Sequence, residues 1–455
     1  MKTKIPTQNL ILTIVILSIT CLVNAKVSLQ QGGVGQVLIY PYYTVNNEMD
    51  TLISITNTTD KVKALKIKFL EGKNNHDALI FNIYIAPYDE WTGALVATPS
   101  TLPGHQGEDS VKLLTSDQTC TVPTSISLQE FLPYGYEADS SDIYGSNMSR
   151  VTEGHIQVFE MGNVTGEFAD WAMTSSDSQN CAGLEANWIT GGSWDVDKEE
   201  NIEDSTIGGI FGTVTLIDVK TGVAVAYKAE AITGFIDESQ HYNPGNSAPN
   251  LNTGTSLVSS VASHITWDFP YQAISSLFIR QNLFAEYIID NGIGANTETV
   301  ITFPTKQFHV EPFSIDPFNN DVGQCEVAEV MAYNRDGDTD TQSLDLCLGI
   351  NILEFVKDDN VTGSSTILGS NNVQRINTSF DKGWVNLEMN QSFSIVTNQG
   401  TTQEQTTTFT GLPYVGFTMQ RYINSNLVGG LLANYAGLIP HKGNATVSTT
   451  PIPSR

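Results

Sequence analysis

Short runs rich in Val, Ile, Thr, Phe and Tyr recur along the chain, and clusters of Asn, Gly, Asp and Pro separate them. β-branched and aromatic residues suit a pleated sheet, whereas the intervening residues form turns. Few segments have helical periodicity, and helices do not alternate with the runs, which argues against a parallel sheet. The runs are 35–43, 51–56, 64–70, 78–86, 154–161, 212–219, 223–232, 297–305, 384–389 and 392–397. The pattern predicts an all-β chain of antiparallel β-sandwich (immunoglobulin-like) modules, two in number, with long loops and few short helices.

Alternation inside the runs predicts which side chains face a core, because successive side chains of a strand point to opposite faces. In the run 78–86 this predicts one buried face and one less buried face. The first face holds Leu79, Phe81, Ile83 and Ile85, and the second holds Ile80, Asn82 and Tyr84. Segments 125–132 and 426–438 are expected to be short helices, although the second contains glycines, which are weak helix formers.

Turn residues predict two hairpins. Residues 57–60 separate the runs 51–56 and 64–70, and Lys220-Thr221-Gly222 separates 212–219 from 223–232. A three-residue connection that ends in glycine suits a type I turn followed by a left-handed residue, since glycine accepts positive φ without a steric penalty.

The length after export, about 430 residues, suggests more than one domain. The stretch "DESQHYNPGNSAPNLNTGTS", residues 237–256, is rich in Asn, Ser, Gly and Pro and is the best candidate for a linker. It divides the chain into an N-terminal β-sandwich domain at 26–236 and a C-terminal β-sandwich domain at 257–455. The alternative is a long loop inside one domain.

The N-terminus has the features of a signal peptide. Two lysines precede the uncharged apolar run "LILTIVILSITCLV", and "VNA" then predicts cleavage after Ala25. Cys21 raises the alternative of a lipoprotein, but Thr20 stands where that processing prefers Gly or Ala. No later run is long and apolar enough for a membrane helix, so no integral span is expected after cleavage.

Four cysteines remain after Cys21 is removed with the signal peptide. An even number in an oxidising compartment favours two disulfides over free buried thiols. Three pairings are possible, and proximity in the sequence favours Cys120 with Cys181 and Cys325 with Cys347. No Cys-x-x-Cys pair indicates a zinc or redox site.

The segment "CEVAEVMAYNRDGDTDTQSLDLC", residues 325–347, predicts a stapled hairpin. If the turn is Arg335-Asp336-Gly337, Cys325 and Cys347 are equidistant from it and face each other across a regular ladder. The alternating Asp336, Asp338 and Asp340 raise the alternative of a weak calcium site. An EF-hand loop starting at Asp336 fails, because Thr341 and Cys347 occupy the positions that need Gly and Glu.

The formal net charge of −27 argues against nucleic acid as a partner, because phosphate binding needs a basic stripe. The one concentrated basic run is "DKVKALKIKF", which contains Lys61, Lys63, Lys66 and Lys68. We interpret it as the solvated face of a strand rather than as a binding patch.

No catalytic residue is assigned, since the chain has neither a Gly-x-Ser-x-Gly elbow nor a His-Glu-x-x-His motif. Aromatic clusters such as "YPYY" (40–43) and "PYGYEADSSDIYG" (133–145) could stack on sugar rings, although core packing explains them more simply. Carboxylates are too numerous to identify a glycosidase pair without geometry. No cofactor is expected, apart from the weak calcium alternative.

The order of several blocks resembles a family of uncharacterised secreted or envelope proteins of Gram-negative bacteria. The resemblance covers about residues 33 to 440, and implies an exported protein of the periplasm or cell surface. It carries no activity, so no residue inherits a catalytic role. The blocks are "GQVLIYPYYTVN", "TLISITNTTDKVKALKIKFLEG", "FNIYIAPYDEWTGAL", "EGHIQVFEMG", "GGIFGTVTLIDV", "TVITFPTKQFHVEPF" and "GLPYVGFTMQRYIN".

Two functions remain. The first is an exported structural or interaction protein of the cell surface, such as a surface-layer, filament, matrix or adhesin component, which associates with itself or with other envelope components and lacks catalytic activity. The second is a secreted carbohydrate-binding protein or polysaccharide-acting hydrolase. A terminal extension or a long unpaired edge strand favours the first, whereas a pocket with two facing carboxylates favours the second.

Overall fold

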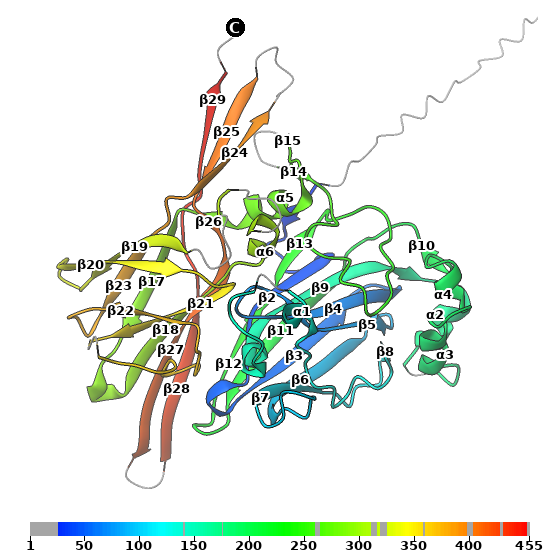
Figure 1. Cartoon of the computed structure of the whole chain (residues 1–455), viewed down its shortest axis with the longest axis horizontal. Coiled ribbons are helices and arrows are strands. Elements are labelled where there is room, and N and C mark those ends of the chain that lie inside the picture. Colours follow the sequence, from blue (N-terminus) through cyan, green and yellow to red (C-terminus); the bar gives the residue numbers. More distant parts are fainter. Residues whose placement is uncertain are drawn as a thin grey trace, which may run out of the picture.

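The computed structural model describes residues 26–139, 142–174, 176–259, 264–310, 316–318, 325–357, 360–397, 404–427 and 431–452. The signal peptide predicted at 1–25 lies outside these residues. Strands dominate, and they pair antiparallel in all sheets except at one parallel pair. Figure 1 shows the N-terminal and C-terminal halves side by side, with the strands of both packed in layers. The predicted all-β, antiparallel β-sandwich class is therefore confirmed.

The N-terminal half is a sandwich of an eight-stranded sheet and a five-stranded sheet. The larger sheet has the order β1 (Ser28–Leu29), β13 (Glu230–Thr233), β2 (Val37–Thr44), β9 (Glu153–Val164), β4 (Val62–Glu71), β5 (Asp77–Ile85) and β8 (Cys120–Val122), with β10 (Ile202–Glu203) beside β9. The smaller sheet has the order β12 (Val223–Lys228), β11 (Ile210–Asp218), β3 (Met49–Asn57), β6 (Glu90–Pro99) and β7 (Asp109–Leu114). Ile67 and Phe81 of the first sheet and Trp91 and Val214 of the second meet in one buried core.

The C-terminal half is a second sandwich. A four-stranded sheet, β17 (Asn282–Ile288), β23 (Lys382–Glu388), β19 (Glu326–Tyr333) and β20 (Thr339–Leu346), packs on a five-stranded sheet. The latter has the order β22 (Val373–Asn377), β21 (Ile350–Val356), β18 (Ala295–Thr302), β27 (Val415–Leu427) and β28 (Leu431–Pro440), with β21 and β22 parallel.

The two sandwiches share a core through the sheet that contains β18. Ile301 and Leu353 point into the C-terminal core. Val300 and Ile352, the next residues on the same strands, belong to the core of the N-terminal half. Because strand side chains alternate between faces, this sheet is packed on both sides. The halves are thus joined by continuous apolar packing.

Short elements complete the chain. The helices are α1 (Tyr134–Glu137), α2 (Gly166–Ala172), α3 (Cys181–Ala186), α4 (Ser193–Val196), α5 (Pro270–Phe278) and α6 (Lys306–Val310), with 3₁₀ turns at Asn46–Glu48, Met148–Thr152 and Asn291–Ile293. Two small sheets pair β14 (Leu257–Ser259) with β15 (His264–Thr266) and β16 (Ile279–Arg280) with β26 (Leu412–Pro413). Among the described helices, none combines the length and apolarity needed to cross a membrane.

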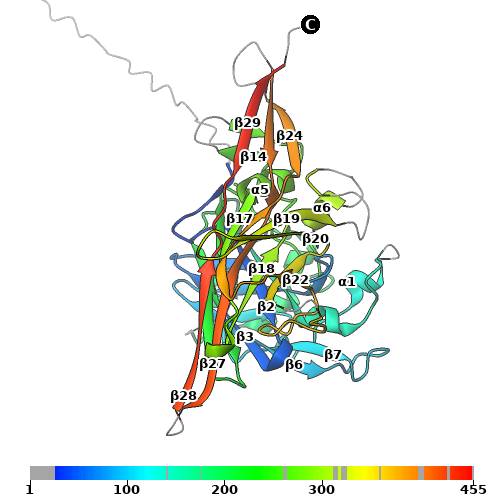
Figure 2. The same cartoon turned by 90° about the vertical axis from the view of Figure 1, so that its left-hand side faces the viewer.

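A three-stranded sheet projects from the rest of the molecule near the C-terminus. It has the order β24 (Ser392–Thr397), β25 (Gln405–Thr410) and β29 (Thr446–Pro451). Figures 1 and 2 show this sheet at one end of the molecule and the β27–β28 hairpin reaching toward the opposite end.

Local predictions met different outcomes. The hairpin at 220–222 is confirmed: β11 pairs with β12, and Gly222 has φ +69°. The hairpin at 57–60 is wrong, because β3 and β4 belong to different sheets and the turn is a corner between them. The helix expected at 125–132 is a series of turns. In the segment 426–438, residues 431–438 lie in strand β28 rather than in a helix.

The expected less buried face of 78–86 is also wrong, since Asn82 and Tyr84 are as buried as their neighbours. The solvated lysine face is wrong for Lys63, Lys66 and Lys68, which are buried, whereas the Lys61 side chain is 42% exposed, as expected. Lys66 donates to the carbonyl of Asn243 at 2.8 Å, and Lys68 donates to that of Ser247 at 2.9 Å. Segment 237–256 therefore lies over the outer face of the eight-stranded sheet.

The division of the chain into two domains at 237–256 stays a prediction. The segment adds further contacts to the N-terminal half: Asn82 donates to the Tyr242 carbonyl, and the Gln240 amide donates to the Met161 carbonyl. Its backbone is thus bonded to the sheet on the N-terminal side of the proposed boundary.

Candidate functional site

The 325–347 hairpin has the predicted register. Tyr333 faces Thr339, Val330 faces Gln342, and Cys325 and Cys347 form a disulfide with their Cα atoms 4.0 Å apart. The Asn334 amide donates to the Asp338 carbonyl, and Gly337 has φ +91°. Local register alone therefore explains this pairing.

The three aspartates of the hairpin do not converge. The Asn334 side chain accepts hydrogen bonds from the amides of Asp336 and Asp338 and donates to the Asp338 carboxylate, which makes a closed turn. Asp340 is occupied separately, because it accepts three hydrogen bonds from Thr378 and Ser379. The Ser379 amide is the main reason that the pKa of Asp340 is lowered. Within the described residues no three His, Cys, Asp or Glu side chains are grouped as a metal site would require.

The second disulfide joins Cys120 of β8 to Cys181 of α3, which is the pair that sequence proximity favours. It lies beside a buried aromatic cluster that the sequence did not reveal. Tyr84 OH is hydrogen-bonded to His241 Nε2 and accepts from Trp188 Nε1, both at 3.0 Å. Burial lowers the pKa of His241 to about 3. The cluster fixes α2–α4 and segment 237–256 to the sheet.

Buried carboxylates hold the loop that follows β21 against both halves. Glu298 of β18 accepts the Ser365 hydroxyl and the amides of Ile367 and Leu368. Burial raises the pKa of Glu298 to about 7. Glu153 of β9 accepts the Asn371 amide from the same loop. These oxygens are engaged in holding backbone and hydroxyl groups, so their role is structural.

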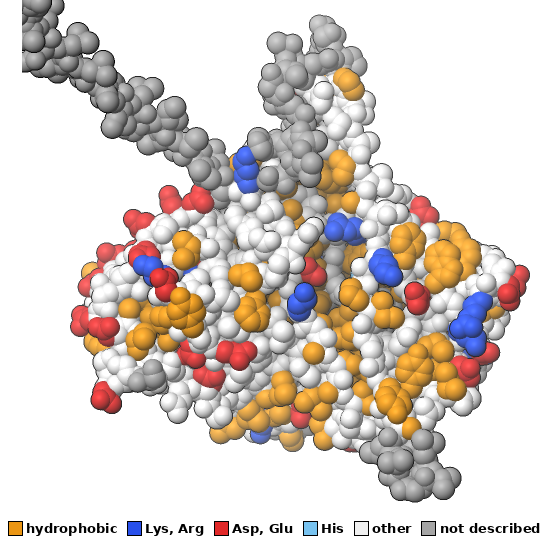
Figure 3. Space-filling view, turned by 180° about the vertical axis from the view of Figure 1, so that it is seen from behind, with side chains coloured by type: hydrophobic (Ala, Val, Ile, Leu, Met, Phe, Trp, Pro, Cys, Tyr) orange, Lys and Arg blue, Asp and Glu red, His pale blue; other side chains and the backbone are white. Residues whose placement is uncertain are grey.

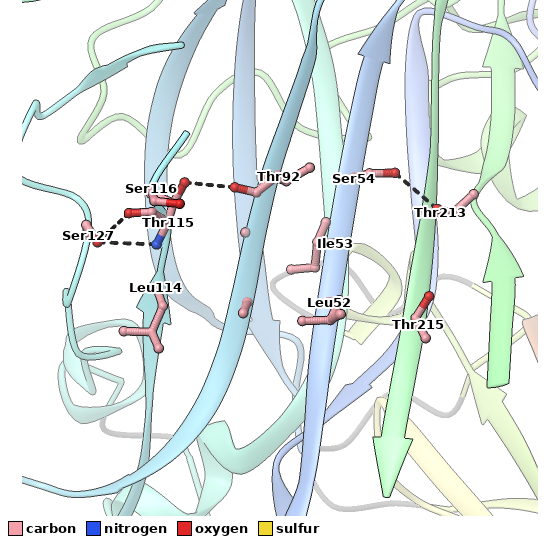
Figure 4. Close-up of a pocket in the computed structure, with 12 residues that line it drawn as sticks. Leu52, Ile53, Ser54, Thr92, Leu114, Thr115, Ser116, Ser127, Thr213 and Thr215 are labelled. Atoms are coloured by element: carbon pink, nitrogen blue, oxygen red, sulfur yellow. Dashed lines mark hydrogen bonds between the residues drawn. The ribbon is translucent and has the colours of Figure 1, made fainter. Parts of the chain in front are cut away.

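One surface cavity, of about 530 Å³, lies on the outer face of the five-stranded N-terminal sheet. Figure 4 shows hydroxyl side chains of Ser54, Thr92, Thr115, Ser127 and Thr213 around it. Ser54 and Thr213 bond to each other at 3.0 Å, the Thr115 and Ser127 hydroxyls donate to backbone carbonyls, and the Thr92 hydroxyl donates to the Asp117 carboxylate. The lining contains no ionisable side chain, so it offers no general acid or base.

A second cavity, of about 480 Å³, lies between the four-stranded C-terminal sheet and strands β27 and β28. We call it the Trp384 cleft. Aromatic, cationic and amide side chains line it together, in contrast to the hydroxyl-lined cavity. The lining residues are Phe284, Ala285, Glu286, Tyr287, Ile288, Asn334, Arg335, Lys382, Gly383, Trp384, Gln420, Tyr422, Ile439 and Lys442.

The edge of the C-terminal sheet β24–β25–β29 is the third candidate. β29 has a partner on one side only, β25, within the described residues, and every residue of β29 is exposed. The Ile452 amide donates to the Glu404 carbonyl, so the backbone groups of Ile452 and of every second residue before it point toward β25. Since hydrogen-bonded pairs alternate along an antiparallel ladder, the backbone groups of Val447 and Thr449 point to the open edge.

Comparison with known proteins adds no assignment: no protein-family model matches the sequence, and no curated protein matches it significantly.

Proposed function

We propose that this chain is an exported structural protein of a bacterial cell envelope, which associates with copies of itself and has no catalytic activity. The observation that carries the proposal is the open edge of the projecting C-terminal sheet. An unpaired strand presents a row of N–H and C=O groups to which another strand can add.

The composition of this sheet supports association. The strands β24, β25 and β29 contain no Lys, Arg, Asp or Glu, although the chain as a whole has a net charge of −27. Charged side chains on an edge strand are a common protection against pairing. The sheet lacks that protection, and its neutrality reduces the repulsion that the acidic surface would otherwise impose on two approaching copies.

The disulfides support export, because structural disulfides persist in oxidising compartments. The resemblance to secreted proteins of Gram-negative bacteria and the signal peptide predicted at 1–25 support the same compartment. The proposed location is therefore the cell surface or the periplasm of a Gram-negative bacterium.

The test combines cell fractionation with negative-stain microscopy and sedimentation of the purified mature chain. Thr449→Pro removes an N–H from the open edge, whereas Thr449→Ser retains it and serves as the matched control. We expect assemblies from the wild type and from Thr449→Ser, and a monomer from Thr449→Pro. A cytoplasmic location, or a wild-type chain that stays monomeric at high concentration, would contradict the proposal.

A further inference from the structure

We propose that the Trp384 cleft binds an acidic carbohydrate, which would make this chain a glycan-contacting as well as a self-associating protein. The proposal is independent of the sheet edge at β29. It starts from the position of one tryptophan on the solvent side of a sheet.

Trp384 lies on the outer face of β23, and 40% of its surface is exposed. Its neighbours Val385 and Leu387 alternate with it and point into the core. The outer face of a half-buried antiparallel sheet normally carries polar residues. A single exposed aromatic residue there would be ordinary, but a contiguous group of exposed rings marks a candidate binding site.

The tryptophan ring is held in place by its neighbours across the sheet. It stacks on the ring of Tyr333 with centroids 4.3 Å apart and planes 11° apart, and Phe284 approaches it edge-on at 6.3 Å. In the strand register Glu286, Trp384 and Tyr333 form one row across β17, β23 and β19. The result is a rigid aromatic surface with a carboxylate beside it, and its order is fixed before any ligand binds.

The polar lining is rich in positive charge. Arg335, Lys382 and Lys442 line the cleft, and Glu286 is the one carboxylate among its lining residues. None of the three cations forms an ion pair or a side-chain hydrogen bond with the residues that the structure describes. In a chain with 49 acidic and 22 basic residues, three unpaired cations around one cavity favour an anionic ligand.

Amide and phenol groups complete the lining. Gln420 donates from Nε2 to the Glu286 carbonyl, and Tyr422 OH lies 3.3 Å from Gln420 Oε1. The cavity volume of about 480 Å³ falls within the roughly 300–1,000 Å³ typical of small-molecule sites. Sugar rings present apolar C–H faces and many hydroxyls, so they match an exposed ring surrounded by hydrogen-bonding groups.

Charge selects among sugars. A uronic acid or another carboxylated sugar would place its anionic group near Lys382 and Arg335 and its ring against Trp384. Asp336 and Asp338, in the same turn as Arg335, are not among the residues that line the cleft. Hydrolysis of the sugar is not part of the proposal, because a glycosidase needs a pair of carboxyl groups about 5 to 10 Å apart and Glu286 is alone in the lining.

Figure 3, which views the molecule from the side opposite to Figure 1, shows hydrophobic side chains interspersed with Lys and Arg over the C-terminal half. Tyr435 faces Tyr422 across the β27–β28 ladder and is 64% exposed, which extends aromatic surface away from the cleft. The ligand could therefore be a chain of several sugars rather than a single one.

The test is calorimetric titration of the mature chain with oligogalacturonate, with a neutral glucan oligosaccharide of equal length as the comparison, in EDTA to exclude calcium bridging. We expect oligogalacturonate to bind and the neutral glucan to bind at least about tenfold more weakly. Equal binding of the two sugars would overturn the assignment of an acidic ligand, and binding of neither would overturn the site.

Trp384→Ala should weaken oligogalacturonate binding by about tenfold or more, and Trp384→Phe should restore part of it because it retains a ring. Lys382→Gln should weaken binding and reduce its dependence on salt. The matched controls are Tyr134→Ala and Lys220→Gln, which change an exposed aromatic and an exposed lysine elsewhere. Unchanged binding in Trp384→Ala would refute the proposal. Unchanged sedimentation of all these variants would show that sugar binding at the Trp384 cleft does not depend on self-association through β29.

Discussion

Replacing Glu298 with glutamine tests whether the loop at 365–368 is held by a buried carboxyl group that is neutral under mildly acidic conditions. Glu298 is fully buried in the middle of β18, and burial is the main cause that raises its pKa to about 7 from a reference of 4.5. The nearby Glu354 raises the pKa further, whereas the amides of Ile367 and Leu368 act in the opposite direction.

The sign of the pH dependence follows from proton uptake. Between pH 4.5 and 7 the folded chain keeps a proton on Glu298 that the unfolded chain has lost, so the free energy of unfolding falls as the pH rises through this range. The contribution of Glu298 to stability is fully present below its pKa in the unfolded chain and is lost above its pKa in the folded chain. The separation of the two pKa values corresponds to about 3 kcal/mol.

The assay is urea-induced unfolding at pH 5, 6, 7 and 8, followed by tryptophan fluorescence. The glutamine side chain in Glu298→Gln cannot titrate, so we expect the wild type to lose about 3 kcal/mol relative to this variant between pH 5 and pH 8. Taking the difference between the two proteins cancels the titration of groups that do not interact with Glu298, including Lys66, whose pKa burial lowers to about 7. Glu167→Gln, a change at an exposed residue of α2, is the matched control.

Parallel stability curves for the wild type and Glu298→Gln would refute the reasoning. They would mean that Glu298 is ionised in the folded chain at pH 5 and that its three hydrogen-bond donors outweigh its burial.

Two further predictions concern the stapled hairpin. The double variant Cys325→Ser/Cys347→Ser should lower the free energy of unfolding by about 3 kcal/mol in urea titrations, because the disulfide closes a loop with a sequence separation of 22. An unchanged urea midpoint would show that this disulfide restricts the unfolded chain little. Gly337→Val should lower the unfolding free energy by about 1–2 kcal/mol, because φ at this position is +91° and a β-branched residue is strained there. The control Gly437→Val, on exposed β28, should have no such effect. Equal effects at the two sites would contradict the assignment of the cost to positive φ.

The hairpin at 325–347 was predictable from the sequence because its geometry is local. A three-residue turn fixes the register, and the register alone brings Cys325 and Cys347 together. The corner at 57–60 has equally good turn residues, yet its two strands join different sheets. Turn-forming residues indicate that the chain changes direction, but which strands then pair depends on packing between segments that are distant in the sequence.

The lysines of β4 show why burial was misjudged. Their spacing matches a solvated strand face, but carbonyls of Asn243 and Ser247 cover Lys66 and Lys68 from more than 170 positions away in the chain. Such a partner leaves no local signal. Trp384 did leave a signal in the sequence. In "WVNLEM" it lies at alternate positions with Asn386 and Glu388, and therefore on the polar face of the strand. One aromatic residue on the polar face of a strand does not identify a surface site, because only a contiguous exposed patch does, and the neighbours Tyr333 and Phe284 come from other strands.

Limited proteolysis would decide how segment 237–256 behaves. As a flexible linker between two domains it should be cut first, because small polar residues in an exposed connection are preferred by proteases. Its contacts argue for the opposite result. Lys66 and Lys68 donate to its carbonyls, Asn82 binds the Tyr242 carbonyl, and His241 is buried among aromatic rings. Cleavage requires that a protease bind an extended stretch of backbone, so these bonds must open first. Trypsin is uninformative because the segment contains no Lys or Arg, whereas thermolysin can cut before Leu251. We therefore expect the segment to resist thermolysin under native conditions, with first cuts elsewhere in the chain. Lys66→Met/Lys68→Met, which removes both donors while retaining the apolar stems, should make the segment sensitive; Lys112→Met is the matched control. Early cleavage of the wild type within 237–256, followed by separation of two stable fragments, would refute this expectation and establish the segment as a linker.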